Sequence, residues 1–540
     1  MTDNNTKMNM LRRFAIGDIL RRHAQRFPDK KALIFLSPTG EVIEYTWNEF
    51  NSSINRVANG LMALGIGKGD KVGIFSLNSP QFVIMTQALV KIGASIVTIN
   101  ASLRGEDVRF IVKQSDAKIL FVEDIFVDAV KQILPDITDV KLGYLGTTGS
   151  KGRPEGWMDF NELFNNYPDY EPEVEIDIED LATLTYTSGT EALPKGVMLT
   201  HGNWHSLALS ALDWGLSKDD IILESLPLFY TGGMGVLYLS LLTGGTTLLL
   251  QLPDPGKIVE MGAKFKVTSI VLPPTVYVRL LGTPGIKEVA SCLRKCITFG
   301  ATMPEGMITG WNELAPHIQW LSLYASSELS CLGTVGIFKD IEDIPERNFA
   351  WNGKPASTLE TRIVDDDDKD VPIGGVGEMV FRGPAVFKGY YKDEEKTDKV
   401  FADGWFHSGD LGRMNEEGEV FFVDRKKDMV KSGGENISCA SVEFVVSSHS
   451  KVAEVAAFGV PHPDWMEALT VAVIPKEGGD ILTEEEIIQH CREKLPKFKV
   501  PKYVIIANDF PRNPTGKILK RELRAMYKDL ATKTKSIVTY

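Results

Sequence analysis

Short apolar runs alternate with amphipathic segments along most of the chain, and this alternation restricts the fold more than any other feature. The apolar runs have the length of buried strands: residues 71–77, 94–100, 118–123, 246–252 and 267–273. Two segments between them have the length and patterning of helices: residues 82–93 and 107–115. Strands that alternate with helices predict α/β layers with largely parallel sheets.

The pattern changes near Pro355, where short alternating segments punctuated by Gly and Asp replace the longer runs. This texture is typical of antiparallel hairpins, and the four aspartates from Asp365 to Asp368 are expected to form an exposed turn. Beyond Asp424 a mixed pattern of two helices and three strands indicates a small α+β domain. We therefore predict an N-terminal domain over residues 1–424, with a β-rich subdomain at about 355–424, and a C-terminal domain over 425–540.

Bulk properties narrow the class of protein. A chain of 540 residues is too long for one hydrophobic core. With 59 Lys and Arg against 72 Asp and Glu, the formal net charge is −13, which argues against a nucleic-acid-binding surface. The most apolar stretch, residues 235–252, is interrupted by Thr and Gly and reads as a buried helix, a turn and a strand rather than a membrane span.

The cysteines and the N-terminus indicate where the protein works. Five scattered cysteines make a poor disulfide framework and suit a reducing compartment. Cys292 and Cys296 have helical spacing, without a second Cys/His pair to complete a zinc site, and are expected on one face of a helix. The first residues are polar and lack the apolar core of a secretory signal. A soluble cytoplasmic protein is therefore expected.

Residues 184–199, "LTYTSGTEALPKGVML", hold a cluster of hydroxyl side chains, two glycines and Lys195. A Ser/Thr/Gly turn after a strand directs N–H groups and hydroxyls toward one point, which suits phosphate oxygens. It is not a Walker A loop, because Pro194 precedes Lys195 and Gly196 follows it. Residues 196–204 are expected to begin a helix. Taken alone, such a loop is more often a structural turn.

This loop and four later segments together resemble the adenylate-forming superfamily, which includes acyl-CoA synthetases, nonribosomal-peptide adenylation domains and firefly-type luciferases. The four later segments are residues 323–328, 406–412, 424–437 and 511–523, in the family's order and spacing. The resemblance implies a two-step reaction with ATP, Mg²⁺ and coenzyme A. A carboxylate attacks the α-phosphate of ATP, and a thiol then displaces AMP from the acyl-adenylate. It also implies that the small C-terminal domain is mobile.

By that resemblance the opening loop holds the β- and γ-phosphates of ATP through Thr187, Ser188, Gly189, Thr190 and Lys195. The metal ligands implied are Glu328 and Thr190, and Ser327 stands where a Thr usually contacts the α-phosphate. Gly300 and Ala301 resemble the adenine-pocket segment, with Tyr324 stacking on the base. Alternatively, Gly300 serves only a turn between a strand and a helix.

Asp410 resembles the residue that accepts both ribose hydroxyls, and Phe422 and Arg425 are further nucleotide contacts implied by the family. His407 is expected to be structural, because nothing in the sequence pairs with it. Lys517 resembles the lysine of adenylation, which steadies the carboxylate against the α-phosphate. Thr187, Lys195, Glu328 and Lys517 are thus the catalytic candidates.

The resemblance also supplies a hinge, at Lys427, about which the C-terminal domain swings between the two half-reactions. Residues that would line a tunnel for coenzyme A are Lys431, Gly433, Gly434 and Glu435. Glycines suit a place where a pantetheine arm passes close to the backbone. Two departures lie in the phosphate loop, where Glu191 and Ala192 replace the usual hydroxyl residue and Gly.

The acyl pocket is expected around Trp204, Trp214, Tyr230, Gly232, Gly233 and Leu332. Its apolar character favours a hydrophobic carboxylic acid, such as a medium- or long-chain fatty acid. Tyr230 replaces the His of many relatives. An aryl or alicyclic acid ligase, and a non-catalytic nucleotide- or acyl-binding relative, are the alternatives. A homodimer and peripheral contact with a membrane surface are both compatible with these features.

Overall fold

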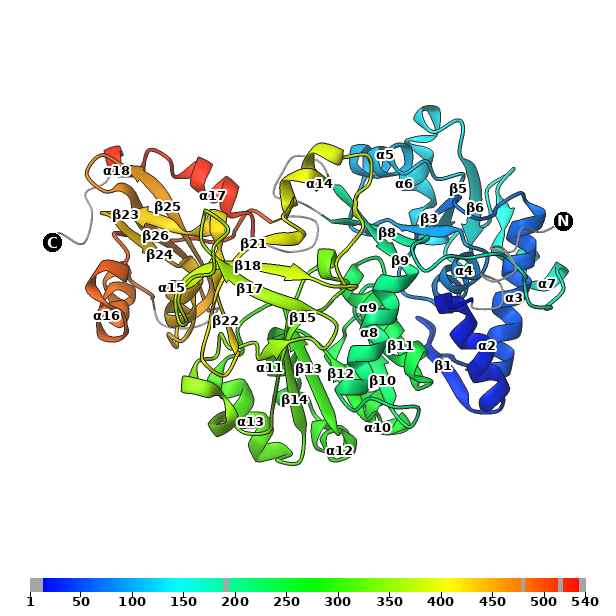
Figure 1. Cartoon of the computed structure of the whole chain (residues 1–540), viewed down its shortest axis with the longest axis horizontal. Coiled ribbons are helices and arrows are strands. Elements are labelled where there is room, and N and C mark those ends of the chain that lie inside the picture. The colour runs from blue at the N-terminus through cyan, green and yellow to red at the C-terminus, as the bar shows by residue number, and fades with distance from the viewer. Residues whose placement is uncertain (1–12, 188–193, 477–480, 513–517, 534–540) are drawn as a thin grey trace. The chain divides into compact units, whose positions relative to one another are not determined.

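The computed structural model describes residues 13–187, 194–476, 481–512 and 518–533 (Figure 1). The chain divides into two compact units. The first comprises Met1–Thr361 and Phe381–Phe406, and the second Arg362–Val380 and His407–Tyr540. The division therefore falls inside the β-rich region. Within the described ranges, no helix is long and apolar enough to cross a membrane.

The first unit contains two sheets with mainly parallel strands, as the alternating pattern predicts. The nine strands of one sheet, in spatial order, are β16 (Lys354–Pro355), β15 (Gly333–Phe338), β14 (Gln319–Ala325), β13 (Lys295–Phe299), β12 (Ser269–Val271), β10 (Ile221–Glu224), β11 (Thr246–Leu250), β1 (Lys31–Leu36) and β2 (Val42–Thr46). The eight strands of the other are β19 (Gly389–Tyr390), β9 (Lys195–Thr200), β8 (Leu181–Thr187), β4 (Ser95–Thr98), β3 (Lys71–Phe75), β5 (Ile119–Glu123), β6 (Lys141–Leu145) and β7 (Met158–Asp159).

Helices cover these sheets (Figure 1). They are α2 (Ile16–Arg26), α3 (Trp47–Ala63), α4 (Pro80–Lys91), α5 (Gly105–Gln114), α6 (Val127–Lys131), α7 (Phe160–Asn166), α8 (His201–Asp213), α9 (Thr231–Thr243), α10 (Pro255–Phe265), α11 (Pro274–Leu281), α12 (Ile286–Cys292), α13 (Glu305–Leu314) and α14 (Glu394–Val400). Helix α8 packs on β9, and α9 packs on α8 and on β10 and β11. The helix pair α8–α9 thus joins the two sheets.

Local sequence explains where these helices begin. The hydroxyl of Ser79 accepts a hydrogen bond from the backbone N–H of Phe82, and Pro80 occupies the first turn of α4. Thr200 and Asn203 form a reciprocal capping box at the start of α8. Helix α8 therefore starts at His201, after strand β9 has paired antiparallel with β8. A helix does begin within residues 196–204, as expected, but only at His201, because Lys195–Thr200 first completes a β-hairpin.

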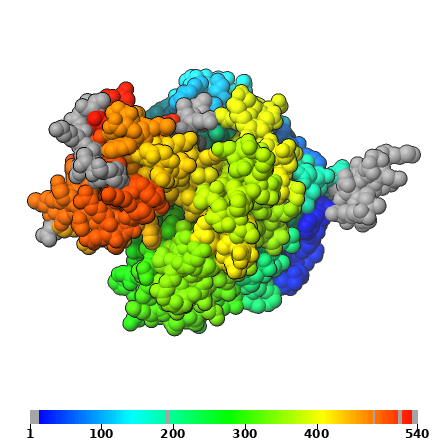
Figure 2. Space-filling model, turned by 60° about the vertical axis from the view of Figure 1, so that its left-hand side comes forward, coloured from blue at the N-terminus to red at the C-terminus, as the bar shows by residue number. Residues whose placement is uncertain are grey.

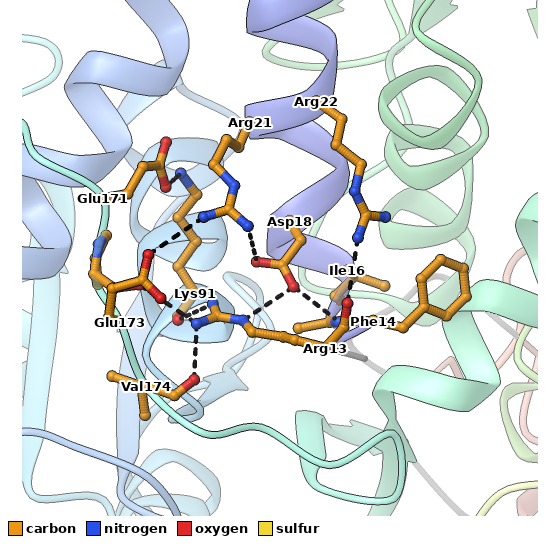
Figure 3. A network of polar contacts seen from close by, with 12 residues as sticks. Arg13, Phe14, Ile16, Asp18, Arg21, Arg22, Lys91, Glu171, Glu173 and Val174 are labelled. Atoms are coloured by element: carbon orange, nitrogen blue, oxygen red, sulfur yellow. Dashed lines mark hydrogen bonds and ion pairs between the residues drawn. The ribbon is translucent and has the colours of Figure 1, made fainter. Parts of the chain in front are cut away.

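A buried polar network fixes α2 against α4 and the segment near Glu171 (Figure 3). Arg13 donates from Nε to Asp18 at 3.0 Å and from Nη1 to the carbonyl of Val174 at 2.7 Å. The ammonium of Lys91, which is almost wholly buried, contacts Glu171 Oε2 at 2.7 Å. It also donates to two asparagine side chains of α3, Asn51 and Asn55. This network stabilises the N-terminal part of the first unit.

The second unit holds most of the β-rich region and the chain that follows it. Strands β17 (Glu360–Val364), β18 (Val376–Arg382) and β21 (Trp405–Met414) lie side by side, and β22 (Val420–Arg425) and β20 (Phe401–Ala402) pair with β21. A second sheet comprises β24 (Glu435–Ile437), β23 (Val430–Ser432), β26 (Met466–Pro475), β25 (Val452–His462) and β27 (Tyr503–Ile506). Its helices are α15 (Cys439–Ser447), α16 (Glu484–Lys494), α17 (Lys520–Met526) and α18 (Leu530–Lys533). Residues beyond β23 give the orange and red surface in Figure 2.

The antiparallel hairpins and the exposed turn at Asp365 to Asp368 are confirmed, and so are the two helices and three strands after Asp424. All five cysteines are free thiols. Cys292 and Cys296 do not share a helix face, however. Cys292 ends α12, the backbone of Leu293 is extended, and Cys296 lies in β13. The four-residue spacing spans a helix end rather than a helical turn.

Candidate active site

Two parallel strands of the nine-stranded sheet end at one edge, and the residues expected around adenine follow them. Phe299 of β13 lies beside Leu323 of β14. Gly300, with φ of +82°, leaves β13 in a left-handed turn that favours glycine. Tyr324 follows Leu323 and stacks on Phe381, with ring centroids 5.7 Å apart. The sequence therefore positions the predicted adenine segment and Tyr324 at adjacent strand ends.

Glu328 lies just beyond that edge, in a single 3₁₀ turn formed by Ser327–Leu329. The backbone carbonyl of Glu328 accepts a hydrogen bond from the N–H of Phe387 at 2.8 Å. Its carboxylate oxygen Oε1 accepts one from the hydroxyl of Tyr390 at 3.0 Å. Glu328 is therefore held at both its backbone and its side chain by the segment that leads into β19.

The same tyrosine contacts the lysine of the phosphate loop. Thr187 and Lys195 face each other across the β8–β9 hairpin, and the ammonium of Lys195 lies 5.3 Å from the centre of the Tyr390 ring. Strand β19 reaches this place because Gly389 and Tyr390 pair with Met198 and Val197 of β9. Tyr390 thus joins Lys195 and Glu328, which are far apart in sequence.

Tyr390 is a candidate site residue, by its contacts with Glu328 and Lys195, that the sequence did not reveal. It stands in "GYY", residues 389–391, where no periodicity or charge pattern distinguishes it. The only local signal is Gly389, whose φ of +134° and close approach to Thr397 fit glycine best. Ser188, Gly189 and Thr190, and the departures Glu191 and Ala192, lie outside the described residues.

The groups near Glu328 suit magnesium-bound phosphates. The hydroxyl of Ser326 is buried and has no hydrogen-bond partner in the described part of the chain, so a ligand oxygen can satisfy it. Among the described residues, no group of three or more His, Cys, Asp or Glu is placed to hold a metal ion. A lone carboxylate fits Mg²⁺, which binds through one or two carboxylates together with phosphate oxygens and water.

In the second unit the two expected ribose ligands are cross-strand neighbours. Asp410 of β21 faces Arg425 of β22, and Arg425 Nε lies 3.9 Å from Asp410 Oδ1. Phe422, on the same strand as Arg425, is half-buried. His407 is not isolated, in contrast to the expectation. Its two ring nitrogens lie 3.7 Å from the carboxylates of Asp368 and Glu378, which the turn and β18 bring to β21.

Lys427 lies in a short 3₁₀ turn, Lys426–Asp428, directly after β22. The neighbouring glycines have a local structural reason. Gly433 and Gly434 have φ of +61° and +87° and form the two-residue turn between β23 and β24, where Ser432 faces Glu435. Lys431 and Glu435 flank this turn with exposed side chains.

Lys517 lies outside the described residues. The chain is described up to Arg512 and again from Ile518. Arg512 and Ile518 form a β-bridge across that segment. After it, Lys520 Nζ contacts Glu443 Oε1 of α15 at 2.8 Å, and Arg524 Nη2 contacts Asp428 Oδ1 at 2.9 Å. Burial alone would lower the pKa of Lys520, but the carboxylate of Glu443 raises it above its ordinary value. Residues 520–524 are therefore anchored to α15 and to the turn that holds Lys427.

Most of the expected acyl-pocket residues gather at the first turn of α9. Tyr230 caps this helix, and its hydroxyl accepts a hydrogen bond from Asn100 Nδ2 at 2.9 Å. A Cβ on Gly232 would lie 3.8 Å from the Phe299 ring. Leu332 is buried beside Cys331, whose thiol donates to the carbonyl of Thr231 at 3.0 Å.

Gly233 and Trp204 have structural roles that the contacts explain. A Cβ on Gly233 would lie only 2.3 Å from the carbonyl oxygen of Pro227, so α9 packs tightly on the preceding segment. Trp204 is wholly buried in α8. Its indole N–H donates to Thr183 at 3.2 Å, and its ring packs on Tyr238 with centroids 4.6 Å apart.

Comparison with known proteins agrees with this geometry. Residues 20–391 match the family described as AMP-binding enzyme, and residues 441–517 match its C-terminal domain. A crotonobetaine/carnitine–CoA ligase of Citrobacter koseri is 32% identical over 517 residues, covering 93% of this chain and 97% of that protein.

Two solved structures are similar over nearly the whole chain. The anthranilate CoA ligase AuaEII in complex with anthranoyl-AMP superposes with a TM-score of 0.85 at 26% identity, covering 96% of this chain and 98% of the other. A Mycobacterium tuberculosis fatty acyl CoA synthetase gives a TM-score of 0.72 at 30% identity, covering 96% and 99%.

Proposed function

The chain belongs to the AMP-binding enzyme family, and from this premise we propose that it joins a largely apolar carboxylic acid to coenzyme A. As an AMP-forming acid–thiol ligase it uses ATP, Mg²⁺ and coenzyme A. In the first half-reaction a carboxylate oxygen bonds to the α-phosphorus of ATP and pyrophosphate leaves. In the second, the thiolate sulfur of coenzyme A bonds to the acyl carbon and AMP leaves.

The observation that carries this proposal is the Lys195–Tyr390–Glu328 arrangement. An anionic acid must approach a polyanion, so the first step needs positive charge and fixed geometry at the phosphates. Lys195 supplies a cation at the end of the phosphate loop. The hydroxyl of Tyr390 donates a hydrogen bond to Glu328, and the Lys195 ammonium lies over the Tyr390 ring. Glu328 would hold Mg²⁺, which would supply charge stabilisation on the phosphate oxygens.

The second unit is proposed to hold the ribose. Its C-terminal part is proposed to swing between the two half-reactions. Asp410 can accept both ribose hydroxyls, and Arg425 lies 3.9 Å from it. Lys517 is proposed to contact the carboxylate and the α-phosphate in the first step. Lys427 is proposed as the hinge of a small domain over residues 425–540. The turn at Gly433 and Gly434 is proposed to admit the pantetheine arm.

The acid is proposed to be a medium- or long-chain fatty acid. The first turn of α9 and Leu332 present mainly apolar groups where the carboxylate would enter. The fatty acyl CoA synthetase among the similar structures supports this class. The alternative is an aryl acid. It is supported by the anthranilate ligase, whose TM-score of 0.85 exceeds the 0.72 of the fatty acyl CoA synthetase. A cytoplasmic location is also proposed, in keeping with five free thiols.

A panel of straight-chain, aryl and alicyclic acids tests the proposal, with AMP and acyl-CoA measured after incubation with ATP, Mg²⁺ and coenzyme A. Turnover that rises with chain length supports the fatty acid. Preference for a ring acid replaces it with the aryl or alicyclic alternative. Absence of pyrophosphate release with every acid would indicate a non-catalytic relative, even though Glu328, Asp410 and Lys517 are present.

A further inference from the structure

A buried carboxyl group lies beneath the first turn of α9, where the sequence indicates a largely apolar pocket with no obvious acidic or basic residue. Glu224 is the last residue of β10, a central strand of the nine-stranded sheet, and its side chain is wholly buried. One carboxyl oxygen, Oε1, accepts a hydrogen bond from the backbone N–H of Leu226 at 2.6 Å. The other, Oε2, has no partner among the residues that the structure describes.

The position of Glu224 is fixed by the segment that follows it. Asn78 Nδ2 donates to the carbonyl of Leu226 at 2.9 Å, and Asn78 Oδ1 accepts from the N–H of Leu228 at 2.8 Å. The first turn of α9 packs on this segment, since Gly233 tolerates no Cβ against the carbonyl of Pro227. The carboxyl group is thus held at the strand end beneath the helix that carries Tyr230 and Gly232.

Cys331 connects this carboxyl group with the loop of Glu328. The thiol of Cys331 donates to the carbonyl of Thr231, and a Cβ on Gly235 would lie 3.0 Å from its sulfur. Cys331 thus packs on the same helix, α9, whose first turn packs on the segment that follows Glu224, next to Leu332 of the proposed acyl pocket.

Two further polar groups at this place lack partners. The hydroxyls of Ser225 and Thr231 are buried without a hydrogen bond to any described residue. Buried polar groups in proteins are nearly always hydrogen-bonded, and leaving one unsatisfied is destabilising. The unpartnered carboxyl oxygen and the two hydroxyls all belong to residues 224–231, which lead into α9, and a bound polar group can satisfy them.

We propose that Glu224 is a specificity-determining residue, whose free carboxyl oxygen hydrogen-bonds a hydroxyl or oxo oxygen on the acyl chain of an otherwise apolar acid. This inference rests on the proposed function and names the substrate class more closely. The described residues place no Lys, Arg or His in an ion pair with Glu224, so burial favours its neutral form, which donates a hydrogen bond. Ser225 and Thr231 can complete the contacts to the same oxygen.

The test compares a plain medium-chain acid with a positional series of its hydroxy and oxo derivatives, together with a matched aryl pair. For the wild type, kcat/KM is expected to be at least about tenfold higher for one oxygen-bearing acid than for its plain counterpart. Glu224→Gln, whose amide still donates and accepts, should keep most of this ratio. Glu224→Met should abolish the ratio and leave the plain acid turned over.

Ser240→Ala is the matched control, because Ser240 is also a buried hydroxyl without a described partner but lies in the last turns of α9. It should leave the ratio unchanged. Equal kcat/KM of the wild type for plain and oxygen-bearing acids overturns the inference without any variant. So does a preference for an acid with a quaternary ammonium group that Glu224→Gln abolishes. If no acid yields AMP, the proposed function fails instead.

Discussion

The hydroxyl of Tyr390 donates a hydrogen bond to Oε1 of Glu328 at 3.0 Å. Because the Tyr390 ring also faces Lys195 at 5.3 Å, one side chain orients both the acidic and the basic group of the proposed phosphate site. Strand β19 brings it there by pairing with β9, directly beside the hairpin that carries Lys195. Tyr390 is therefore the first residue to substitute.

Tyr390→Phe should slow adenylation about tenfold or more, because a hydrogen bond to a charged group contributes about 1.5–3 kcal/mol. ATP–pyrophosphate exchange as a function of Mg²⁺ concentration measures the effect. Tyr391→Phe is a matched control, since the Tyr391 hydroxyl donates to Asp116, away from Glu328, at 2.7 Å. Equal loss in both variants would show a general structural effect and contradict the positioning role.

Lys517→Ala should lower the rate of pyrophosphate release by about 10²–10³, the usual effect of removing one group that stabilises developing charge. Thioester formation from supplied acyl-adenylate should persist, because that step no longer involves the triphosphate. Rapid-quench measurement of each half-reaction separates the two. Equal loss of both steps would argue against the role assigned to Lys517.

Lys91→Met should destabilise the first unit by about 2 kcal/mol or more, since Glu171 would lose its buried partner (Figure 3). The double variant Lys91→Met/Glu171→Gln should recover part of that loss. Lys118→Met removes a more exposed pair, with Asp70, and should cost less than about 1 kcal/mol. Urea unfolding gives all three values, and an equal cost for both lysines would refute the importance of the buried network.

His201 should make the protein less stable in acid. Burial lowers its pKa from 6.5 to about 3, so below pH 6.5 the unfolded chain takes up a proton that the folded chain does not. This contribution to stability is therefore lost progressively as pH falls from 6.5 toward 3, by up to about 1.4 kcal/mol per pH unit. His201→Asn, which can still accept from the N–H of Ile16, should flatten the pH dependence, whereas His317→Gln at an exposed site should not.

Much of the fold was accessible from local patterning. Apolar runs such as residues 94–100 correspond to buried parallel strands, and β4 is buried along its whole length. The mistakes occurred where local signals are ambiguous. The segment after Lys195 carries a helix cap at Thr200, but tertiary pairing with β8 makes its first residues a strand. Cys292 and Cys296 have helical spacing, yet the helix ends between them.

The site was only partly accessible, for a physical reason. Motif residues such as Asp410, Arg425 and Glu328 are recognised by type and order, and the structure adds that Asp410 faces Arg425. Tyr390 and Glu224 act through neighbours far away in sequence, so no spacing identifies them. Glu224 in particular stands in an apolar run, where only its burial and its unpartnered oxygen distinguish it.

The main proposal is that this chain activates an acid through an adenylate. Its most direct test is the stoichiometry of products after incubation of the purified chain with ATP, Mg²⁺, coenzyme A and the acid panel. If the reaction proceeds through an adenylate, AMP, pyrophosphate and acyl-CoA form in equal amounts, and AMP formation depends on the acid. Formation of ADP and phosphate in place of AMP, or no pyrophosphate with any acid, would contradict it.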